Sequence, residues 1–136
     1  MMDTGRLKFE NYNGILYIDA YLNGEFNLND LKDILNEIRE NYSPATDVIL
    51  KKSGSYSVAA NVQTTARSGV KELRNLVYVV EDEKKRKYAE FASTSYMKPY
   101  NARIASSVEE AFSLLSTTSN QKGAIKSGVE MEEANI

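Results

Sequence analysis

The chain of 136 residues has the length of one domain, and its net charge of −2 and sequence pI near 5.3 disfavour nucleic-acid partners, which are bound largely through phosphate neutralisation. It contains neither histidine nor cysteine, which excludes Ser-His-Asp and Cys-His catalysis and zinc sites built on imidazole or thiolate ligands. No apolar run approaches the roughly 18 residues that span a bilayer, and the start lacks a signal-peptide pattern, so we expect a cytoplasmic protein without an integral membrane segment.

A β-hairpin is predicted first, because Asn13-Gly14 separates two runs of β-forming residues and suits a two-residue turn. Alternation along the second run predicts a core face made of Leu16, Ile18, Ala20 and Leu22. Tyr17 and Tyr21 share the opposite face, where tyrosines suit an interaction surface because the ring gives rigid contact area with a polar tip. The alternative is that helices cover both sides of this strand.

A helix is predicted next in "NLNDLKDILNEIRENY", where apolar residues recur at helical spacing. Asn29 is the expected N-cap, and Pro44 lies beyond the expected end. The short apolar run in "DVILKK" then predicts a strand with both faces covered.

The segment from Lys51 to Gly69, "KKSGSYSVAANVQTTARSG", carries serines among small residues and predicts a loop followed by a second helix. Ser55 or Ser57 is expected to cap that helix by accepting backbone N–H bonds. The segment lacks the G-x-x-x-x-G-K-[ST] pattern of nucleotide-binding loops, so a phosphate cradle of that kind is disfavoured.

A second buried strand is predicted at Leu76 to Val80, followed by a helix in "EKKRKYAEFASTSYMK". Asp82 is the expected N-cap, and Pro99 is expected to end the helix. The inner side of the helix is expected to carry Tyr88, Phe91, Ala92 and Ser95.

"NARIA" predicts a short last strand, and "SSVEEAFSLLS" a last helix with a capping box of Ser106 with Glu109 or Ser107 with Glu110. Residues 117–136 are polar and are expected to form a flexible C-terminal tail. Residues 1–116 then form one domain of order ββαβαβαβα. This alternation favours an α/β fold with an N-terminal hairpin and a mixed, largely parallel sheet on which the helices pack.

Two stretches in this order resemble the SpoIIAA-like proteins of the STAS type. In "LVYVVEDEKKRKYAEFASTSYMKPYNARIASSVEEAFSLL", a strand, a helix, a Lys-Pro, a short strand and a helix starting near "EEA" follow one another as in the C-terminal half of that family. "DVILKKSGSYSVAANVQTTARSG" occupies the position of the family's central strand, switch loop and second helix. With the hairpin, the resemblance covers roughly residues 5 to 116.

The resemblance implies a small domain that works by protein contact, without catalysis or a cofactor. In the best-known members, the anti-sigma-factor antagonists, a partner kinase phosphorylates a serine at the start of the second helix and thereby prevents binding. Ser57 is the nearest match to that serine, with Ser55 and Ser53 next. The competing interpretation is helix capping and loop solvation, which are the commoner roles of such serines.

We therefore expect a non-enzymatic interaction or regulatory module whose partner is another protein, either a regulatory kinase or a second copy of the chain. Lys84 and Lys85 are candidates for its interaction surface, although a solvated helix face is the commoner role of such a charge run. Two alternatives stay open. One is a carrier with a small-molecule or lipid cavity between sheet and helices, and the other is an enzyme using tyrosine, lysine or carboxylate chemistry.

Overall fold

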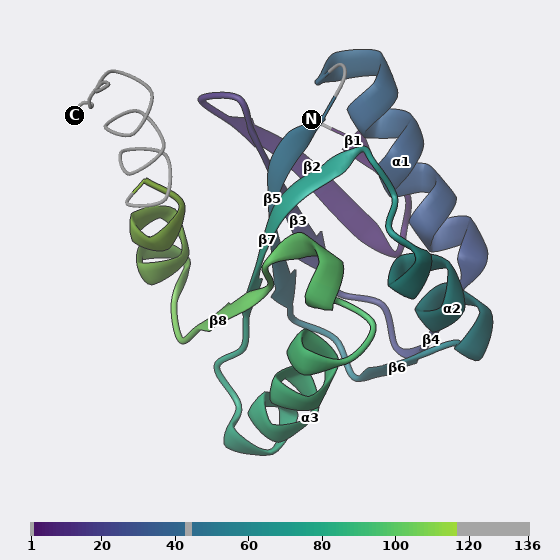
Figure 1. Cartoon of the computed structure of the whole chain (residues 1–136), viewed down its shortest axis with the longest axis vertical. Helices are drawn as coiled ribbons and strands as arrows, with labels where there is room; N and C mark the ends of the chain where they lie inside the picture. Colours follow the sequence, from purple (N-terminus) through teal and green to yellow (C-terminus); the bar gives the residue numbers. More distant parts are fainter. Residues whose placement is uncertain (1, 43–44, 117–136) are drawn as a thin grey trace.

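Strands and helices alternate along the chain in the computed structural model, which describes residues 2–42 and 45–116 (Figure 1). The elements are β1 (Met2–Asp3), β2 (Leu7–Tyr12), β3 (Ile15–Ala20), β4 (Gly24–Phe26), α1 (Leu28–Asn41), β5 (Thr46–Lys52), β6 (Tyr56–Val58), α2 (Ala60–Ser68), β7 (Leu73–Val79), α3 (Glu83–Thr94), the 3-10 helix η1 (Lys98–Tyr100) and β8 (Arg103–Ala105). Residues 108–116 are also helical.

The predicted α/β fold is confirmed, and the expected order of elements is incomplete. The short strands β1, β4 and β6 were not predicted and interrupt the order ββαβαβαβα. The expected helix end at Pro44 and the expected tail at residues 117–136 lie outside the described residues.

The main sheet has six strands in the order β1-β2-β3-β5-β7-β8. β1, β2 and β3 pair antiparallel, and β3, β5, β7 and β8 pair parallel. The turn between β2 and β3 is the predicted one, because Asn13 and Gly14 both adopt positive φ angles, 55° and 86°. The sheet is therefore mixed and largely parallel, as the alternation of elements predicted.

A second, two-stranded sheet is formed by β4 and β6, which pair parallel from Gly24–Tyr56 to Phe26–Val58. β4 follows β3 closely in the chain, and β6 follows β5. The small sheet therefore continues from the carboxyl ends of two central strands of the main sheet.

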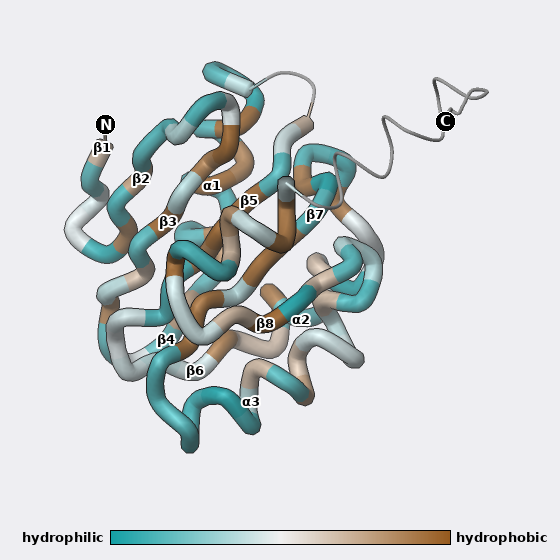
Figure 2. Tube along the Cα trace, turned by 90° about the vertical axis from the view of Figure 1, so that its left-hand side faces the viewer, coloured by the Kyte–Doolittle hydropathy of each residue, from teal (hydrophilic) through white to brown (hydrophobic). Residues whose placement is uncertain are grey.

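Both faces of the central strands are buried. The larger apolar cluster contains the predicted core face of β3 and lies on the side of the sheet covered by α1 and α2. A smaller cluster on the other face joins Ile49, Val77 and Val79 to the helix of residues 108–116. Figure 2 shows hydrophobic residues along β5 and β7 and hydrophilic residues at the start of α3.

The helix starts differ from the predictions in two places. The N-cap of α1 is Asn27 and not Asn29: Asn27 accepts from the Asp30 N–H at 3.0 Å, and Asp30 accepts from the Asn27 N–H at 2.8 Å. The N-cap of α2 is Ala59, which has no polar side chain, so neither Ser55 nor Ser57 caps it. The reason is that β6 separates the serine loop from α2.

Asp82 caps α3 as predicted. At the last helix the predicted capping box of Ser107 with Glu110 is half formed. Ser107 accepts from the Glu110 N–H at 3.1 Å, while the Glu110 carboxylate accepts from the N–H of Ser106, one residue earlier, at 2.7 Å.

The predicted inner side of α3 is partly wrong. Ala89 and Ala92 are buried, whereas Phe91 is 61% exposed. Small residues face inward here because α3 packs closely on β8 and η1. α3 also ends at Thr94, and Pro99 lies within η1 instead of ending the helix.

Candidate functional site

The serine loop from Ser53 to Ser55 follows β5 directly and is held against the end of β3. The N–H groups of Ser53 and Gly54 both donate to the Ala20 carbonyl oxygen, at 3.1 and 3.0 Å. A Cβ on Gly54 would lie 1.9 Å from the Leu22 carbonyl oxygen, so the close approach of these backbones requires glycine. The loop is therefore held against the end of β3, which is the neighbour of β5 in the sheet.

Three lysines meet beside this loop. A depression of about 270 Å³ is lined by Lys52, Ser55, Tyr56, Lys84, Lys85 and Tyr88, which we call the lysine basin. Lys52 is the last residue of β5, while Lys84 and Lys85 belong to the first turn of α3. The basin thus lies at the carboxyl ends of parallel strands, where α/β proteins commonly bind ligands.

Lys52 forms the floor of the lysine basin and is 8% exposed. Its Nζ donates to the Tyr56 carbonyl oxygen at 2.6 Å and lies 3.2 Å from the centroid of the Tyr56 ring. Within the described part of the chain it has no ion pair. Burial, and secondly the charge of Lys85, lowers the pKa of Lys52 to about 8.

Lys84 and Lys85 form the rim of the lysine basin at the N-terminus of α3. The nearby Asp82 carboxylate accepts hydrogen bonds from the backbone N–H groups of Lys84 and Lys85, at 2.8 and 3.3 Å. These hydrogen bonds lower the pKa of Asp82. The Nζ of Lys85 donates to the Gly54 carbonyl oxygen at 3.4 Å. No carboxylate is among the described residues that line the basin.

Tyrosine hydroxyls continue inward from the lysine basin. The hydroxyls of Tyr56 and Tyr78 lie 3.3 Å apart, and the Tyr96 hydroxyl donates to that of Tyr88 at 3.4 Å. Burial is the main cause that raises the pKa of Tyr56, Tyr78 and Tyr96. These three hydroxyls therefore stay neutral near pH 7, and the lysines supply the charge of the basin.

The predicted site residues are only partly brought together. Ser55, Lys84 and Lys85 line the lysine basin, whereas Ser53 and Ser57 are exposed residues outside its lining. In β6, the Ser57 hydroxyl donates to the Gly24 carbonyl oxygen at 3.4 Å.

The predicted tyrosine surface lies elsewhere. Tyr17 is half-buried against the smaller apolar cluster and makes an edge-to-face contact with Tyr12, with ring centroids 5.7 Å apart. Burial raises the pKa of Tyr17 to about 12. Tyr21 is also half-buried, and its hydroxyl donates to Asp3. The position of Tyr17 therefore fits the alternative interpretation, in which both sides of the strand are covered, better than it fits an open interaction surface.

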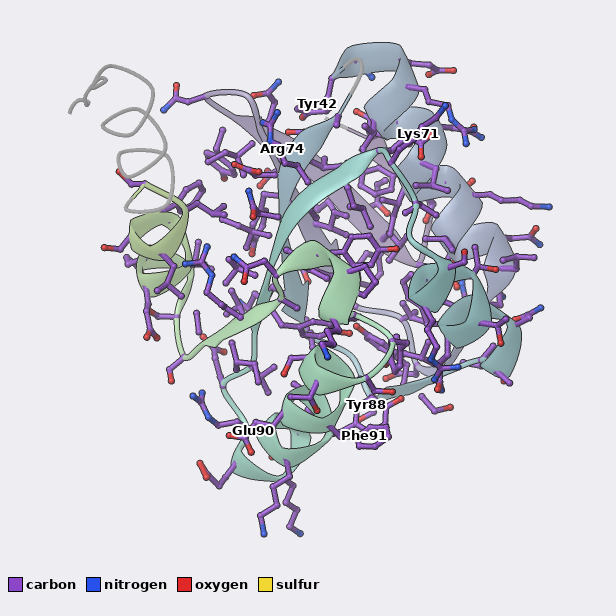
Figure 3. The ribbon with its side chains drawn as sticks, in the orientation of Figure 1. Tyr42, Lys71, Arg74, Tyr88, Glu90 and Phe91 are labelled. Carbon is purple, nitrogen blue, oxygen red and sulfur yellow. The ribbon has the colours of Figure 1, made fainter. Side chains whose placement is uncertain are left out.

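Sequence reasoning missed Lys52, Tyr56 and Tyr88 as site residues. Lys52 and Lys51 are neighbours at the end of a strand, where Lys52 is buried and Lys51 is partly exposed. The alternation of strand faces is the one local signal that distinguishes them. Tyr88 and Phe91 project from the same side of α3 (Figure 3), and the pattern had assigned both to the core.

Comparison with known proteins identifies no relative: no protein-family model, no curated protein and no solved structure matches the chain. Among the described residues, no helix is long and apolar enough to cross a membrane, and no group of three or more metal-ligating side chains is found.

An apolar cavity of about 60 Å³ lies between the main sheet and the helices α1 and α2. Its walls include Ile18, Leu31, Val62 and the rings of Tyr78 and Tyr100. This volume is well below the roughly 150 Å³ of a cavity that holds benzene.

Proposed function

We propose that the protein is a cytoplasmic, non-enzymatic regulatory module of the SpoIIAA-like type, which binds an acidic segment of a partner protein at the lysine basin. The observation that carries this proposal is the meeting of Lys52, Lys84 and Lys85 around one depression that no described carboxylate lines. A surface of one charge sign steers and orients a partner of the opposite sign.

The order of elements also supports the proposal. β7, α3, the turn that contains Lys98-Pro99, β8 and the helix of residues 108–116 follow one another as the SpoIIAA-like resemblance implies. The serine loop stands in the place of that family's switch loop. The lysine basin therefore adjoins the segment through which the family's antagonists are regulated.

Phosphorylation of Ser55 would switch this site off. Ser55 lines the lysine basin, and a phosphate on its hydroxyl adds up to about two negative charges among the three lysines. The basin would then no longer attract an acidic segment. Ser57 and Ser53 lie outside the lining, so we rank Ser55 first.

Capture of the partner from the protein's own cells tests the proposal. The bait proteins are the wild type, the double variant Lys84→Glu with Lys85→Glu, and the control Lys32→Glu with Lys71→Glu. The control makes the same change of net charge at two exposed lysines outside the basin. Lys71 lies at the opposite end of the molecule from α3 (Figure 3).

The same protein partner should be retained by the wild type and the control and be reduced about tenfold or more with the basin variant. Intact mass spectrometry of the untagged protein reads out a phosphate, and fragmentation assigns it to a serine. Equal retention of the partner by all three baits would contradict docking at the lysine basin.

The carrier alternative has one observation in its favour, the apolar cavity between sheet and helices. Because the cavity is smaller than a benzene site, a lipid would require α1 or α2 to move away from the sheet. Native mass spectrometry of the freshly isolated protein distinguishes this function: a co-purifying apolar molecule supports it, and an unliganded mass contradicts it.

A further inference from the structure

We propose that the lysine basin binds a phosphate monoester, presented either by a phosphorylated side chain or by a small phosphorylated molecule. The inference rests on the site of the proposed function and names the chemistry that this site selects.

The polar residues that line the lysine basin come from three segments of the chain. Lys52 stands at the end of β5, Ser55 in the serine loop, and Lys84 and Lys85 on the first turn of α3. A phosphate monoester offers three terminal oxygens and nearly two negative charges, whereas a carboxylate offers two oxygens and one charge. The ammonium groups of Lys52 and Lys85 lie close enough for the charge of Lys85 to lower the pKa of Lys52, and Lys84 and Ser55 also line the basin. This set of donors matches the phosphate better than the carboxylate.

The ammonium group of Lys52 is held in place before any ligand arrives. The Tyr56 carbonyl oxygen takes one of its N–H bonds, and the Tyr56 ring lies against it with 3.2 Å to the centroid. A side chain that is already ordered loses little further entropy on binding. Because a buried charge without a counter-ion is unfavourable, an anion above Lys52 also relieves a cost that the free protein carries.

The charges around the lysine basin favour an anion. The Asp82 carboxylate accepts hydrogen bonds from the backbone N–H groups of Lys84 and Lys85, and its charge also interacts with the ammonium groups of both lysines, so it offsets part of their positive potential. Those N–H groups belong to the N-terminus of α3, whose helix dipole adds positive potential at the same place. Glu81 and Glu83 are exposed and do not line the basin.

The walls of the lysine basin are aromatic. Tyr56 and Tyr88 supply apolar ring surface beside the ammonium groups, and the Lys52 ammonium lies 6.0 Å from the Tyr88 ring centroid. With a volume of about 270 Å³, the basin has room for a phosphate and a few attached atoms. Phenyl phosphate, which joins a phosphate to one ring, is therefore a suitable probe.

An amide NMR titration of the full chain with phenyl phosphate, at about pH 7 and low salt, tests the inference. Saturable shifts are expected for residues 53–56 and 84–88. The variant Lys84→Gln with Lys85→Gln should weaken binding about tenfold or more, and Lys32→Gln with Lys71→Gln should leave it unchanged. Lys32, Lys71 and Lys84 are exposed and Lys85 is partly exposed, so we expect all the variants to fold. The unshifted part of each spectrum verifies this.

Further ligands make the test selective. Benzoate, which carries a carboxylate on the same ring, should bind about tenfold more weakly than phenyl phosphate. Capped peptides that contain phosphoserine or phosphotyrosine distinguish the two sources: tighter binding of either peptide than of phenyl phosphate identifies a phosphorylated side chain, and weaker binding of both identifies a small molecule.

The inference is overturned if no saturable shifts occur, if the basin variant binds as the wild type does, or if benzoate binds equally well. These outcomes leave the proposed function standing when the partner is still lost with Lys84→Glu and Lys85→Glu. The opposite result is also possible: the basin binds phenyl phosphate, but no partner protein is lost when Lys84 and Lys85 are replaced. In that case the inference stands and the proposed function fails.

Discussion

Replacing Gly54 by alanine forces a methyl group against the backbone that follows β3. The new Cβ would lie 1.9 Å from the Leu22 carbonyl oxygen and 2.6 Å from the Tyr21 carbonyl carbon. Carbon and oxygen atoms that are not bonded normally stay about 3.3 Å apart or more. Because both contacts are with backbone atoms, the serine loop or the segment after β3 must move by about 1.4 Å.

We expect this movement to lower the free energy of unfolding by about 3 kcal/mol, the upper end of the cost of overpacking. The upper end applies because the movement also stretches the two hydrogen bonds from Ser53 and Gly54 to the Ala20 carbonyl oxygen. Such a loss reduces the folding equilibrium constant about a hundredfold. It also displaces Ser55 and the carbonyl that holds Lys85.

Urea unfolding of Gly54→Ala measures this cost, with Gly69→Ala as the matched control. Gly69 has a φ of +87° and a ψ of 105°, and no atom lies within 4 Å of its hypothetical Cβ, so its replacement costs only the strained backbone, about 1–3 kcal/mol. If Gly54→Ala stays within about 0.5 kcal/mol of the wild type, the close approach at the serine loop is refuted.

Three other changes test the cap of α1, the charge of the lysine basin and the packing of α3. Asp30→Ala removes both the N-cap contact and the 2.8 Å ion pair with Arg6, and should lower the free energy of unfolding, measured in urea, by about 2 kcal/mol. A loss of less than about 0.5 kcal/mol contradicts both contacts. Phenyl phosphate affinity should fall severalfold between about pH 7 and pH 9. Burial lowers the pKa of Lys52 to about 8, so Lys52 loses its charge in this range while the phosphate stays dianionic. An affinity that rises over this range refutes the role of Lys52. Phe91 is 61% exposed, so Phe91→Ser should change the free energy of unfolding by less than about 0.5 kcal/mol. Ala92 is 1% exposed, so Ala92→Leu should lower the free energy of unfolding by about 2 kcal/mol. Calorimetry showing the reverse order means that α3 is rotated.

Local patterns were sufficient for five of the six strands of the main sheet, β2, β3, β5, β7 and β8, and for the existence of the helices that pack on it. The Asn13-Gly14 turn, the apolar alternation of β3 and the continuous apolar runs of β5 and β7 are each encoded within a few neighbouring residues. Asp82 was recognisable as a cap because it directly precedes a helical segment. These signals depend on periodicity and turn chemistry, which a single sequence contains.

The small sheet and the lysine basin depend on contacts between distant residues. Strands β4 and β6 have three residues each, too few for a periodic pattern, and they pair Gly24 with Tyr56. Because β6 was not recognised, Ser57 was assigned to a helix cap. In α3, the pattern placed Phe91 inside because it is large and apolar, whereas the close packing of the helix leaves room only for alanine.

Folding order decides when the lysine basin exists. β2 and β3 are joined by a two-residue turn, whereas the parallel pairs join residues about thirty positions apart, such as Leu16 with Val48 and Val48 with Leu76. Bringing such distant segments together costs more chain entropy, so parallel pairs form more slowly than a hairpin. During synthesis, a nascent chain that has not yet reached residue 84 carries one of the three basin lysines. The lysine basin is therefore complete only in chains in which β7 and α3 have already docked, and the proposed binding would be confined to those chains.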